Sequence, residues 1–256
     1  MRFASLGSGS RGNGTLVAHD GACLLVDCGF SLRETHRRLA RLGLVLEDLD
    51  ALVITHGHRD HVAGLGPVAR ALGRPVWMTH GTWEECRQAG VGPLPEVRLF
   101  DGRDGFSVGP IGLHPFPVPH DAREPCQFVF EGGGRRLGLL TDTGASTAHI
   151  EACLAGVDAL LVECNHDSGM LASGPYPPAL KQRVGGDYGH LANHQAAALV
   201  ARLDSGRLQH LVAMHLSAEN NRPDLARNTL AAAAGWPEAA VAVAGQEGGL
   251  DWRELD

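Results

Sequence analysis

The stretch Thr55-His56-Gly57-His58-Arg59-Asp60-His61 follows directly after the apolar run Ala51–Ile54. Because this run is rich in apolar and β-branched residues and is followed by polar ones, we predict a buried strand over residues 51–55. The stretch after it carries three imidazoles and a carboxylate, which contribute little to an apolar core. Neutral imidazole and carboxylate groups are good ligands for zinc, manganese and iron. The sequence therefore predicts a metal site at the end of this strand, with more than one ion.

Length and composition favour one large domain. The 256 residues, 44% of them hydrophobic, suffice for one core, and we expect a single domain over residues 1–256. No apolar run reaches the length of a membrane span, and the N-terminus lacks the apolar segment of a signal peptide. We therefore expect a cytoplasmic protein with no membrane partner. The formal net charge of −7 argues weakly against an extended nucleic-acid-binding surface but leaves a local cationic rim open.

Strand and helix signals alternate in the first and last thirds of the chain, whereas the middle third contains short strands. A capping box at Ser31–Glu34 and a proline at position 223 predict the starts of two helices, and the glycines at 132–134 predict a hairpin turn. The expected strands are 24–27, 51–55, 75–79, 106–108, 111–114, 127–130, 136–140, 159–163, 211–215 and 241–243. Expected helices follow Ser31 and the histidine cluster (to about residue 72) and cover 82–89, 146–153, 193–203 and 223–234. This order predicts two packed sheets with outer helices.

Further metal ligands are expected at other strand ends, because four ligands on one loop cannot complete two coordination spheres. His120 lies in a proline-stiffened loop after an expected strand, and Asp142 and His215 each end an apolar run. Asp142 could instead be a turn residue or the N-cap of the next helix. His120 and His215, taken singly, could be structural residues. Their common position after strands favours the metal-ligand interpretation.

With these motifs the sequence resembles the metallo-β-lactamase superfamily over nearly its whole length. The resemblance implies an α/β fold, a four-layer αβ/βα sandwich, with two divalent metal ions between its sheets. These would be zinc or manganese ions, with iron as an alternative. The implied ligands of the first ion are His56, His58 and His120; those of the second are Asp60, His61 and His215; Asp142 would bridge the two. The bridging aspartate counts against a lactamase, since dinuclear lactamases of the superfamily generally lack it.

Finer motifs resemble the YycJ/WalJ-type branch, whose members are similar to ribonuclease Z and to cyclic phosphodiesterases. They are Ser5–Asn13, Glu163–Asp167, Gly174–Pro177, Leu180–Arg183, Gly189–Asn193 and His215–Asn221. The sequence departs from the branch at Cys164 and Ala192, where serine is usual, and neither change removes a ligand. Members of the branch are regarded as metal-dependent 5′-to-3′ DNA exonucleases. The resemblance thus implies a dinuclear phosphodiesterase acting on nucleic acid, with DNA as the expected substrate and RNA as an alternative.

Two residues are expected to be catalytic, Asp60 and His190. The resemblance implies that a metal-bridged hydroxide attacks the phosphorus and that His190 protonates the leaving group, which histidine can do near neutral pH. His190 could also be a helix-start residue without chemistry. A second hypothesis is a small-molecule hydrolase, acting on a cyclic-nucleotide phosphodiester or a thioester at the same site. A third is a non-enzymatic protein stabilised by metal. The oligomeric state stays open.

The residues predicted to bind substrate rest on weaker signals. The glycine-rich loop at 8–13 could offer backbone N–H groups to a phosphate, or could equally be a hairpin turn. Lys181 and Arg183 could bind phosphates or could be a solvent-exposed charge pair. His166 could line the substrate site or could cap a loop. The predicted set is Ser8, Ser10, Asn13, His166, Lys181, Arg183 and Asn220.

Overall fold

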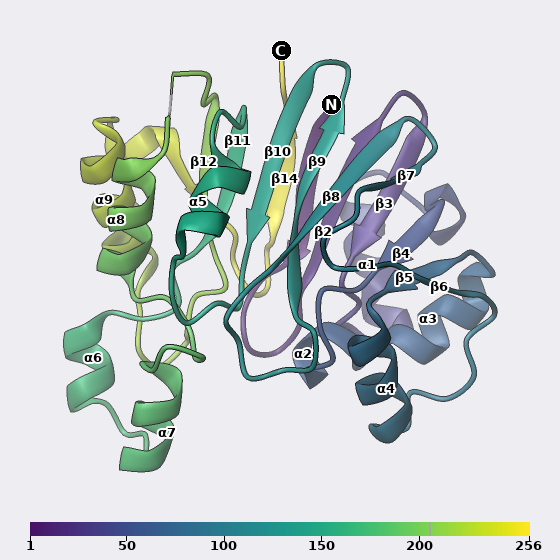
Figure 1. Cartoon of the computed structure of the whole chain (residues 1–256), viewed down its shortest axis with the longest axis horizontal. Helices are drawn as coiled ribbons and strands as arrows, with labels where there is room; N and C mark the ends of the chain where they lie inside the picture. Colours follow the sequence, from purple (N-terminus) through teal and green to yellow (C-terminus); the bar gives the residue numbers. More distant parts are fainter. Residues whose placement is uncertain (205) are drawn as a thin grey trace.

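Two sheets of seven strands each form the centre of the computed structural model, which describes residues 1–204 and 206–256 (Figure 1). The first sheet runs β14 (Leu250–Glu254), β1 (Arg2–Gly7), β2 (Gly14–His19), β3 (Ala22–Val26), β4 (Ala51–Val53), β5 (Val76–Met78) and β6 (Val97–Leu99). The second runs β13 (Val241–Val243), β12 (His210–Met214), β11 (Ala159–Glu163), β10 (Arg135–Leu140), β9 (Cys126–Gly132), β8 (Ile111–Pro117) and β7 (Phe106–Val108). Each sheet joins an antiparallel part to a parallel part.

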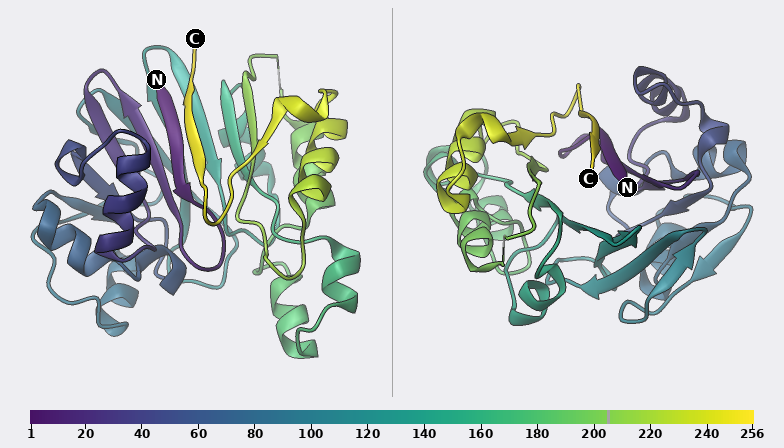
Figure 2. Two further views of the ribbon diagram at one scale, coloured as in Figure 1. Left: turned by 180° about the vertical axis from the view of Figure 1, so that it is seen from behind. Right: turned by 90° about the horizontal axis from the view of Figure 1, so that it is seen from above.

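Helices cover the outer face of each sheet (Figures 1 and 2). The first sheet carries α1 (Leu32–Arg41), α3 (Leu65–Leu72) and α4 (His80–Gln88), with a 3₁₀ turn at Leu46–Asp48. The second carries α5 (Ala148–Leu154), α8 (Asn193–Arg202) and α9 (Pro223–Ala234), with a 3₁₀ turn at Glu238–Ala240. Three short helices, α2 (Arg59–Val62), α6 (Ser168–Ser173) and α7 (Pro178–Val184), lie at one end of the sandwich (Figure 1). No helix of the described residues has both the length and the apolarity to span a membrane.

The apolar residues form three separate clusters, one between the sheets and one under each helical layer. Neighbouring strand residues alternate between them, because successive side chains of a strand point to opposite faces. Leu24 packs between the sheets and Leu25 packs under the helices of the first sheet. In the second sheet, Leu161 packs between the sheets and Leu160 packs under the helices. Three apolar layers separate four layers of secondary structure, which confirms the predicted αβ/βα sandwich.

Most predicted elements are present with ends shifted by one to three residues. The helix predicted after the histidine cluster is α3, which begins at Leu65 and ends at Leu72 as expected, while the short helix α2 lies within the cluster itself and was not predicted. The division between α2 and α3 falls at Gly64. A Cβ atom there would lie 1.7 Å from the carbonyl oxygen of Phe30, and the Gly64 N–H donates to Cys28 at 2.9 Å. The loop after β3 thus packs directly against the backbone of Gly64 and leaves no room for a side chain there. The prediction gave no bounds for β1 and β2, no strand at β6 or β14, and no helix at α6 or α7.

The hairpin between β9 and β10 agrees with its prediction. Gly133 and Gly134 have φ angles of 61° and 73°, and Gly132 pairs with Arg135 across the turn. Positive φ at both central residues is the geometry of the tight hairpin turn that continues the twist of the strands, and glycine adopts it without strain.

Candidate metal centre

Several strands end at the same place, where the sandwich meets α2, α6 and α7. Asp27 follows β3, His56 follows β4, and Asp142 and His215 follow β10 and β12. Asp27, Asp142 and His215 have φ angles of 64°, 52° and 53°. Left-handed backbone is uncommon for residues other than glycine, and each such residue costs on the order of 1–3 kcal/mol. The surrounding structure must therefore hold these three turns, and all three direct a side chain to the same cluster.

The first group of potential ligands is His56, His58 and His120, each of which offers one ring nitrogen within 4.8 Å of the others. His120 Nε2 lies 3.2 Å from His58 Nδ1. His56 Nε2 is buried and has no hydrogen-bond partner among the residues that the structure describes. A buried imidazole nitrogen without a partner is costly, and a metal ion between the three rings would satisfy it.

The second group is Asp60, His61, Asp142 and His215, again with ligand atoms within 4.8 Å of one another. His215 Nε2 lies 3.2 Å from Asp60 Oδ2, and His61 Nε2 lies 3.2 Å from Asp142 Oδ2. Asp142 Oδ2 is buried, and its 3.2 Å contact with His61 Nε2 does not meet hydrogen-bond geometry, so no residue in the described part of the chain satisfies it. Nitrogen and carboxylate oxygen donors at this spacing fit a divalent metal ion. Both groups therefore fit a metal ion, because their donors have the right chemistry and because His56 Nε2 and Asp142 Oδ2 are buried without a hydrogen-bond partner.

The outward-facing ring nitrogens of these histidines are held by a second set of residues. His56 Nδ1 lies 3.0 Å from Thr55 Oγ1, and His61 Nδ1 is hydrogen-bonded to Asp27 Oδ2 at 2.8 Å. His120 Nδ1 donates to the carbonyl oxygen of Gly189 at 3.0 Å. Such partners fix the ring and its tautomer, so that the remaining nitrogen faces the metal.

Glu163, at the end of β11, joins the ligand cluster to the predicted proton donor. Its side chain is fully buried, and Oε1 accepts hydrogen bonds from His190 Nδ1 at 2.8 Å and from His215 Nδ1 at 3.0 Å. Oε2 accepts from the backbone N–H groups of Thr143 and Leu191 at 3.1 and 3.0 Å. Burial alone would raise the pKa of Glu163, but the adjacent imidazole of His190 and these hydrogen bonds lower it to about 2. Glu163 is thus an anion that orients two imidazoles.

The carboxylates also change the pKa of the histidines around them. Burial lowers the pKa of His56 well below its ordinary value. Burial acts in the same direction on His61, but Asp142, Asp27 and Asp60 outweigh it and raise its pKa well above the ordinary value. For His190, burial lowers the pKa while Glu163 raises it, and the net shift is upward. Without metal, the carboxylates therefore favour the protonated forms of His61 and His190.

The prediction from sequence did not include Asp27, Thr55 or Glu163 among the site residues. Each does lie at or next to the end of an apolar run, the same signal that identified Asp142 and His215. Their contacts run to residues distant in the sequence, such as Asp27 to His61 and Glu163 to His215. The strand-end signal could have found them as candidates, but not their partners.

Two of the predicted substrate-binding residues support the ligands. Ser8 Oγ accepts a hydrogen bond from the backbone N–H of His215 at 2.8 Å. Asn13 Nδ2 donates to Asp60 Oδ2 at 3.1 Å, and the Asn13 N–H donates to the Asp60 carbonyl at 2.8 Å. Both side chains are buried, whereas Ser10 is exposed beside the site. The loop between β1 and β2 therefore holds Asp60 and His215 in position by hydrogen bonds.

The other four predicted substrate-binding residues are dispersed. Arg183 lies beside the site and pairs with Asp121. Lys181 Nζ donates to the carbonyl oxygen of Ala172 at 2.7 Å and does not line the cavity at the site. His166 and Asn220 are buried outside that lining, and burial lowers the pKa of His166 to about 4. The structure thus brings Ser10 and Arg183 to the cavity, and the substrate contacts of all seven residues stay predictions.

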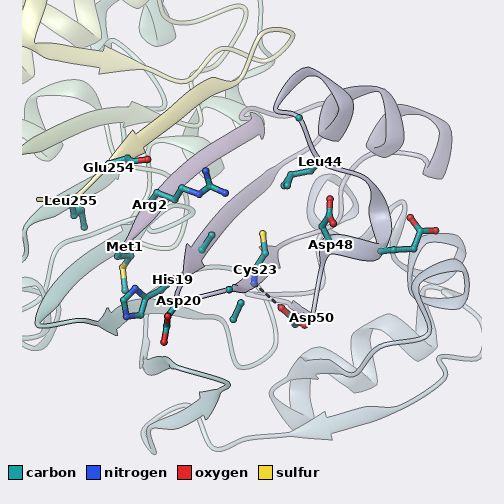
Figure 3. A pocket seen from close by; sticks show the side chains of 15 residues that line it. Met1, Arg2, His19, Asp20, Cys23, Leu44, Asp48, Asp50, Glu254 and Leu255 are labelled. Carbon is teal, nitrogen blue, oxygen red and sulfur yellow. Dashed lines mark hydrogen bonds between the residues drawn. The ribbon is translucent and has the colours of Figure 1, made fainter.

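A cavity of about 330 Å³ opens onto the ligand cluster. Its lining combines potential metal ligands with residues of α7: Ser10, His58, Arg59, Asp60, Asp121, Asp142, Tyr176, Leu180, Arg183, Val184, Gly189, His190 and His215. A larger hollow of about 700 Å³ lies near the chain termini (Figure 3). There the Cys23 N–H donates to Asp50 at 2.9 Å, beside Arg2 and His19. The groups of potential metal ligands found among the described residues lie around the smaller cavity, which makes it the candidate site.

Comparison with known proteins agrees with this geometry. Residues 23–216 match the family described as the beta-lactamase superfamily domain. The chain is 36% identical over 229 residues to exodeoxyribonuclease YycJ of Bacillus anthracis, covering 89% of this chain and 86% of that protein. It is 35% identical over 233 residues to exodeoxyribonuclease WalJ of Streptococcus pneumoniae, covering 90% of this chain and 87% of that protein.

Among solved structures, zinc-bound PqqB from Methylobacterium extorquens is similar in fold, with a TM-score of 0.77 at 20% identity and complete coverage of both chains. The family match covers most of the chain, including the strands and the potential ligands at their ends. The chain belongs to the metallo-β-lactamase superfamily of metal-dependent hydrolases.

Proposed function

We propose that residues 1–256 form one catalytic domain, a phosphodiesterase with two divalent metal ions that degrades DNA as a 5′-to-3′ exonuclease. The observation that supports this proposal is that two groups of potential ligands, His56–His58–His120 and Asp60–His61–Asp142–His215, lie at one cavity together with His190. The YycJ and WalJ relatives, which are named exodeoxyribonucleases, support DNA as the substrate.

The ligand sets assign each residue a place in this proposal. One ion would be held by His56, His58 and His120, and the other by Asp60, His61 and His215, with Asp142 shared. Two divalent ions supply Lewis acidity for the scissile phosphodiester and make water acidic enough to provide hydroxide near neutral pH. Zinc or manganese fits the donors, with iron as an alternative. Asp60 is catalytic in the sense that it holds one of these ions.

His190 is the proposed acid for the leaving group. Its Nδ1 donates to Glu163, which leaves Nε2 as the atom that can give a proton inside the cavity. Burial opposes the protonated form of His190, but Glu163 outweighs burial and raises the pKa, which favours the protonated ring that a general acid needs. A nucleotide leaving as an alkoxide needs such a donor, and the departing oxygen takes the proton as the bond to phosphorus breaks.

A second candidate is a hydrolase of small molecules, such as a cyclic-nucleotide phosphodiester or a thioester. The observation in its favour is the cavity volume of about 330 Å³, near the lower end of the range for small-ligand sites of roughly 300–1,000 Å³. The formal net charge of −7 also gives no general attraction for nucleic acid.

The test compares polymer and small substrates with the same preparation. Protein loaded with manganese or zinc is incubated with DNA labelled at its 5′ or its 3′ end, single- and double-stranded, with matching RNA, and with bis(4-nitrophenyl) phosphate. We expect successive mononucleotide release from the 5′ end of DNA. The His58→Ala variant, which lacks one ligand, is the inactive control. Hydrolysis of the small diester without any DNA degradation under either metal would refute the DNA assignment and favour the second candidate.

A further inference from the structure

The cavity beside the metal-ligating groups has two chemically different parts. One is formed by imidazoles and carboxylates: His58, Asp60, Asp142, His190 and His215. The other is apolar and comes from α7 and the segment before it: Tyr176, Leu180 and Val184. All three apolar side chains are half-buried. We call these three residues the apolar wall.

The apolar wall is fixed to the catalytic residues. The backbone N–H of His190 donates to the carbonyl oxygen of Val184 at 2.9 Å. Gly189 packs so closely on α7 that a Cβ atom there would lie 2.1 Å from the carbonyl oxygen of Arg183. The Arg183 side chain in turn pairs with Asp121, the residue after the ligand His120. A group seated on the wall is therefore held at a set position relative to the predicted proton donor.

A nucleotide has the same two parts as this cavity. Its phosphate is anionic and takes metal-bound or cationic partners, whereas its base is flat, largely apolar and suited to stacking on an aromatic ring. Arg59 and Arg183 add positive charge at the cavity, and Arg59 forms no ion pair with any residue that the structure describes. A thioester or a lactam would leave this combination of aromatic wall and arginines unused.

We propose that the apolar wall binds the base of one unpaired nucleotide, stacked on Tyr176, while its phosphate lies against the metal-ligating residues. This inference rests on the proposed phosphodiesterase function. A base that occupies the wall cannot remain paired in a duplex, because an enzyme pocket takes a base only after it leaves the stack. The enzyme therefore acts faster on single-stranded or frayed ends than on blunt duplex ends.

The test uses two small diesters that differ in the base alone: thymidine 5′-(4-nitrophenyl phosphate) and its abasic analogue, 1,2-dideoxyribose 5-(4-nitrophenyl phosphate), in which hydrogen replaces thymine. We expect the wild-type protein to prefer the first through a lower KM. Tyr176→Ala should reduce the ratio of kcat/KM for the two diesters about 5- to 150-fold, the range for loss of one base–aromatic stack. Tyr176→Phe and Tyr176→Trp should retain the ratio.

The matched control is Tyr188→Ala, because Tyr188 is the other of the two tyrosines of the chain, is 66% exposed and does not line the cavity. It should leave the ratio unchanged. Leu180→Ala is a second wall variant, and metal content and circular dichroism check that each variant folds. Equal loss on both diesters in Tyr176→Ala and Leu180→Ala, or a wild-type protein without preference, would overturn the inference.

Failure of the inference and failure of the proposed function give different results. A protein that degrades DNA from its 5′ end but shows no base preference on the diesters keeps the function and loses the apolar wall as a base site. A protein that prefers the thymidine diester but leaves DNA intact keeps the wall and loses the exonuclease assignment.

Discussion

Glu163 accepts a hydrogen bond from Nδ1 of His190 at 2.8 Å, and this pair connects the end of β11 to the start of α8. The same carboxylate oxygen lies 3.0 Å from Nδ1 of His215, so that one buried anion orients a proposed acid and a proposed metal ligand. The Glu163 carboxylate accepts four hydrogen bonds in all. In a Glu163→Gln variant the side-chain NH₂ group would face two of these four donors and could not accept from them.

Glu163→Gln should therefore lower kcat about 10- to 100-fold, as is typical when a residue that supports a metal ligand is changed. Loss of the anion also removes the main cause of the raised pKa of His190, so the descending limb of the pH–rate profile should move to lower pH. Steady-state kinetics across pH measures both effects. Glu131→Gln, at an exposed carboxylate on β9, is the control. An unchanged profile in Glu163→Gln would contradict the role assigned to Glu163.

His190→Ala should keep its full metal content but lose turnover according to the leaving group. General-acid catalysis contributes roughly 10²- to 10⁴-fold, and it matters only when the leaving oxygen needs a proton. We expect this decrease in turnover rate on DNA. We expect little change in the rate on bis(4-nitrophenyl) phosphate, because its leaving group departs as a stable anion. Metal analysis and parallel rate measurements check this. Loss of metal from the variant would mean that His190 is a ligand.

Asp27→Asn should weaken metal binding through His61. Asp27 Oδ2 is hydrogen-bonded to His61 Nδ1 at 2.8 Å, and Asn cannot supply the same charge to the ring. A change of this kind costs about 10- to 100-fold in metal affinity or activity. Titration with a competing chelator measures the affinity. Asp50→Asn makes the same chemical change in the hollow near the termini, and it should bind metal like the wild type.

Metal binding should release protons and tighten as pH rises. Burial acts against the charged forms of His61 and His215, but their carboxylate neighbours raise both pKa values, that of His215 to about 10. Both rings are thus protonated below the raised pKa, and a metal ion must displace these protons. Apparent affinity should therefore increase with pH up to about 10. Calorimetry in buffers of different ionisation enthalpy counts the protons, and pH-independent binding would be the contrary result.

Asp158 should make fold stability depend on pH in a way that the metal site does not. Its side chain is 1% exposed and accepts from the Arg136 N–H at 2.8 Å and from Arg207 at 3.1 Å. Burial would raise the pKa of Asp158, but these donors hold it below its usual value of 3.8. Because the folded-state pKa is depressed, the stabilisation is present above about 3.8 and is lost as pH falls through the folded value.

Asp158→Asn should accordingly be less stable than wild type by about 1–3 kcal/mol at neutral pH. The difference should shrink below about pH 3.8. Denaturant unfolding at both pH values measures it, and a gap that stays constant across this range would assign the loss to packing instead of charge.

Much of the fold and of the ligand set could be predicted from local patterns. A buried strand followed by a ligand is visible within a few residues, as in Ala51–Ile54 followed by His56. The ends of β7, β11, α9 and β13 agree with the predicted ends. The edge strands β6 and β14 are partly exposed and carry charged residues, so their apolar pattern is weak. Gly64 separates α2 from α3 where it contacts Phe30, a contact that no local pattern contains.

The sequence by itself determined which side chains can hold metal, because imidazole and carboxylate chemistry belongs to the residue and the strand-end pattern is local. Only the tertiary structure decided what supports them. Ser8 holds the backbone of His215 across 207 residues of chain, and Glu163 meets His215 across 52. Such contacts depend on how two sheets pack, and the order of residues along the chain does not specify that packing locally. For the same reason the apolar wall of the cavity became visible only when α7 lay beside His190.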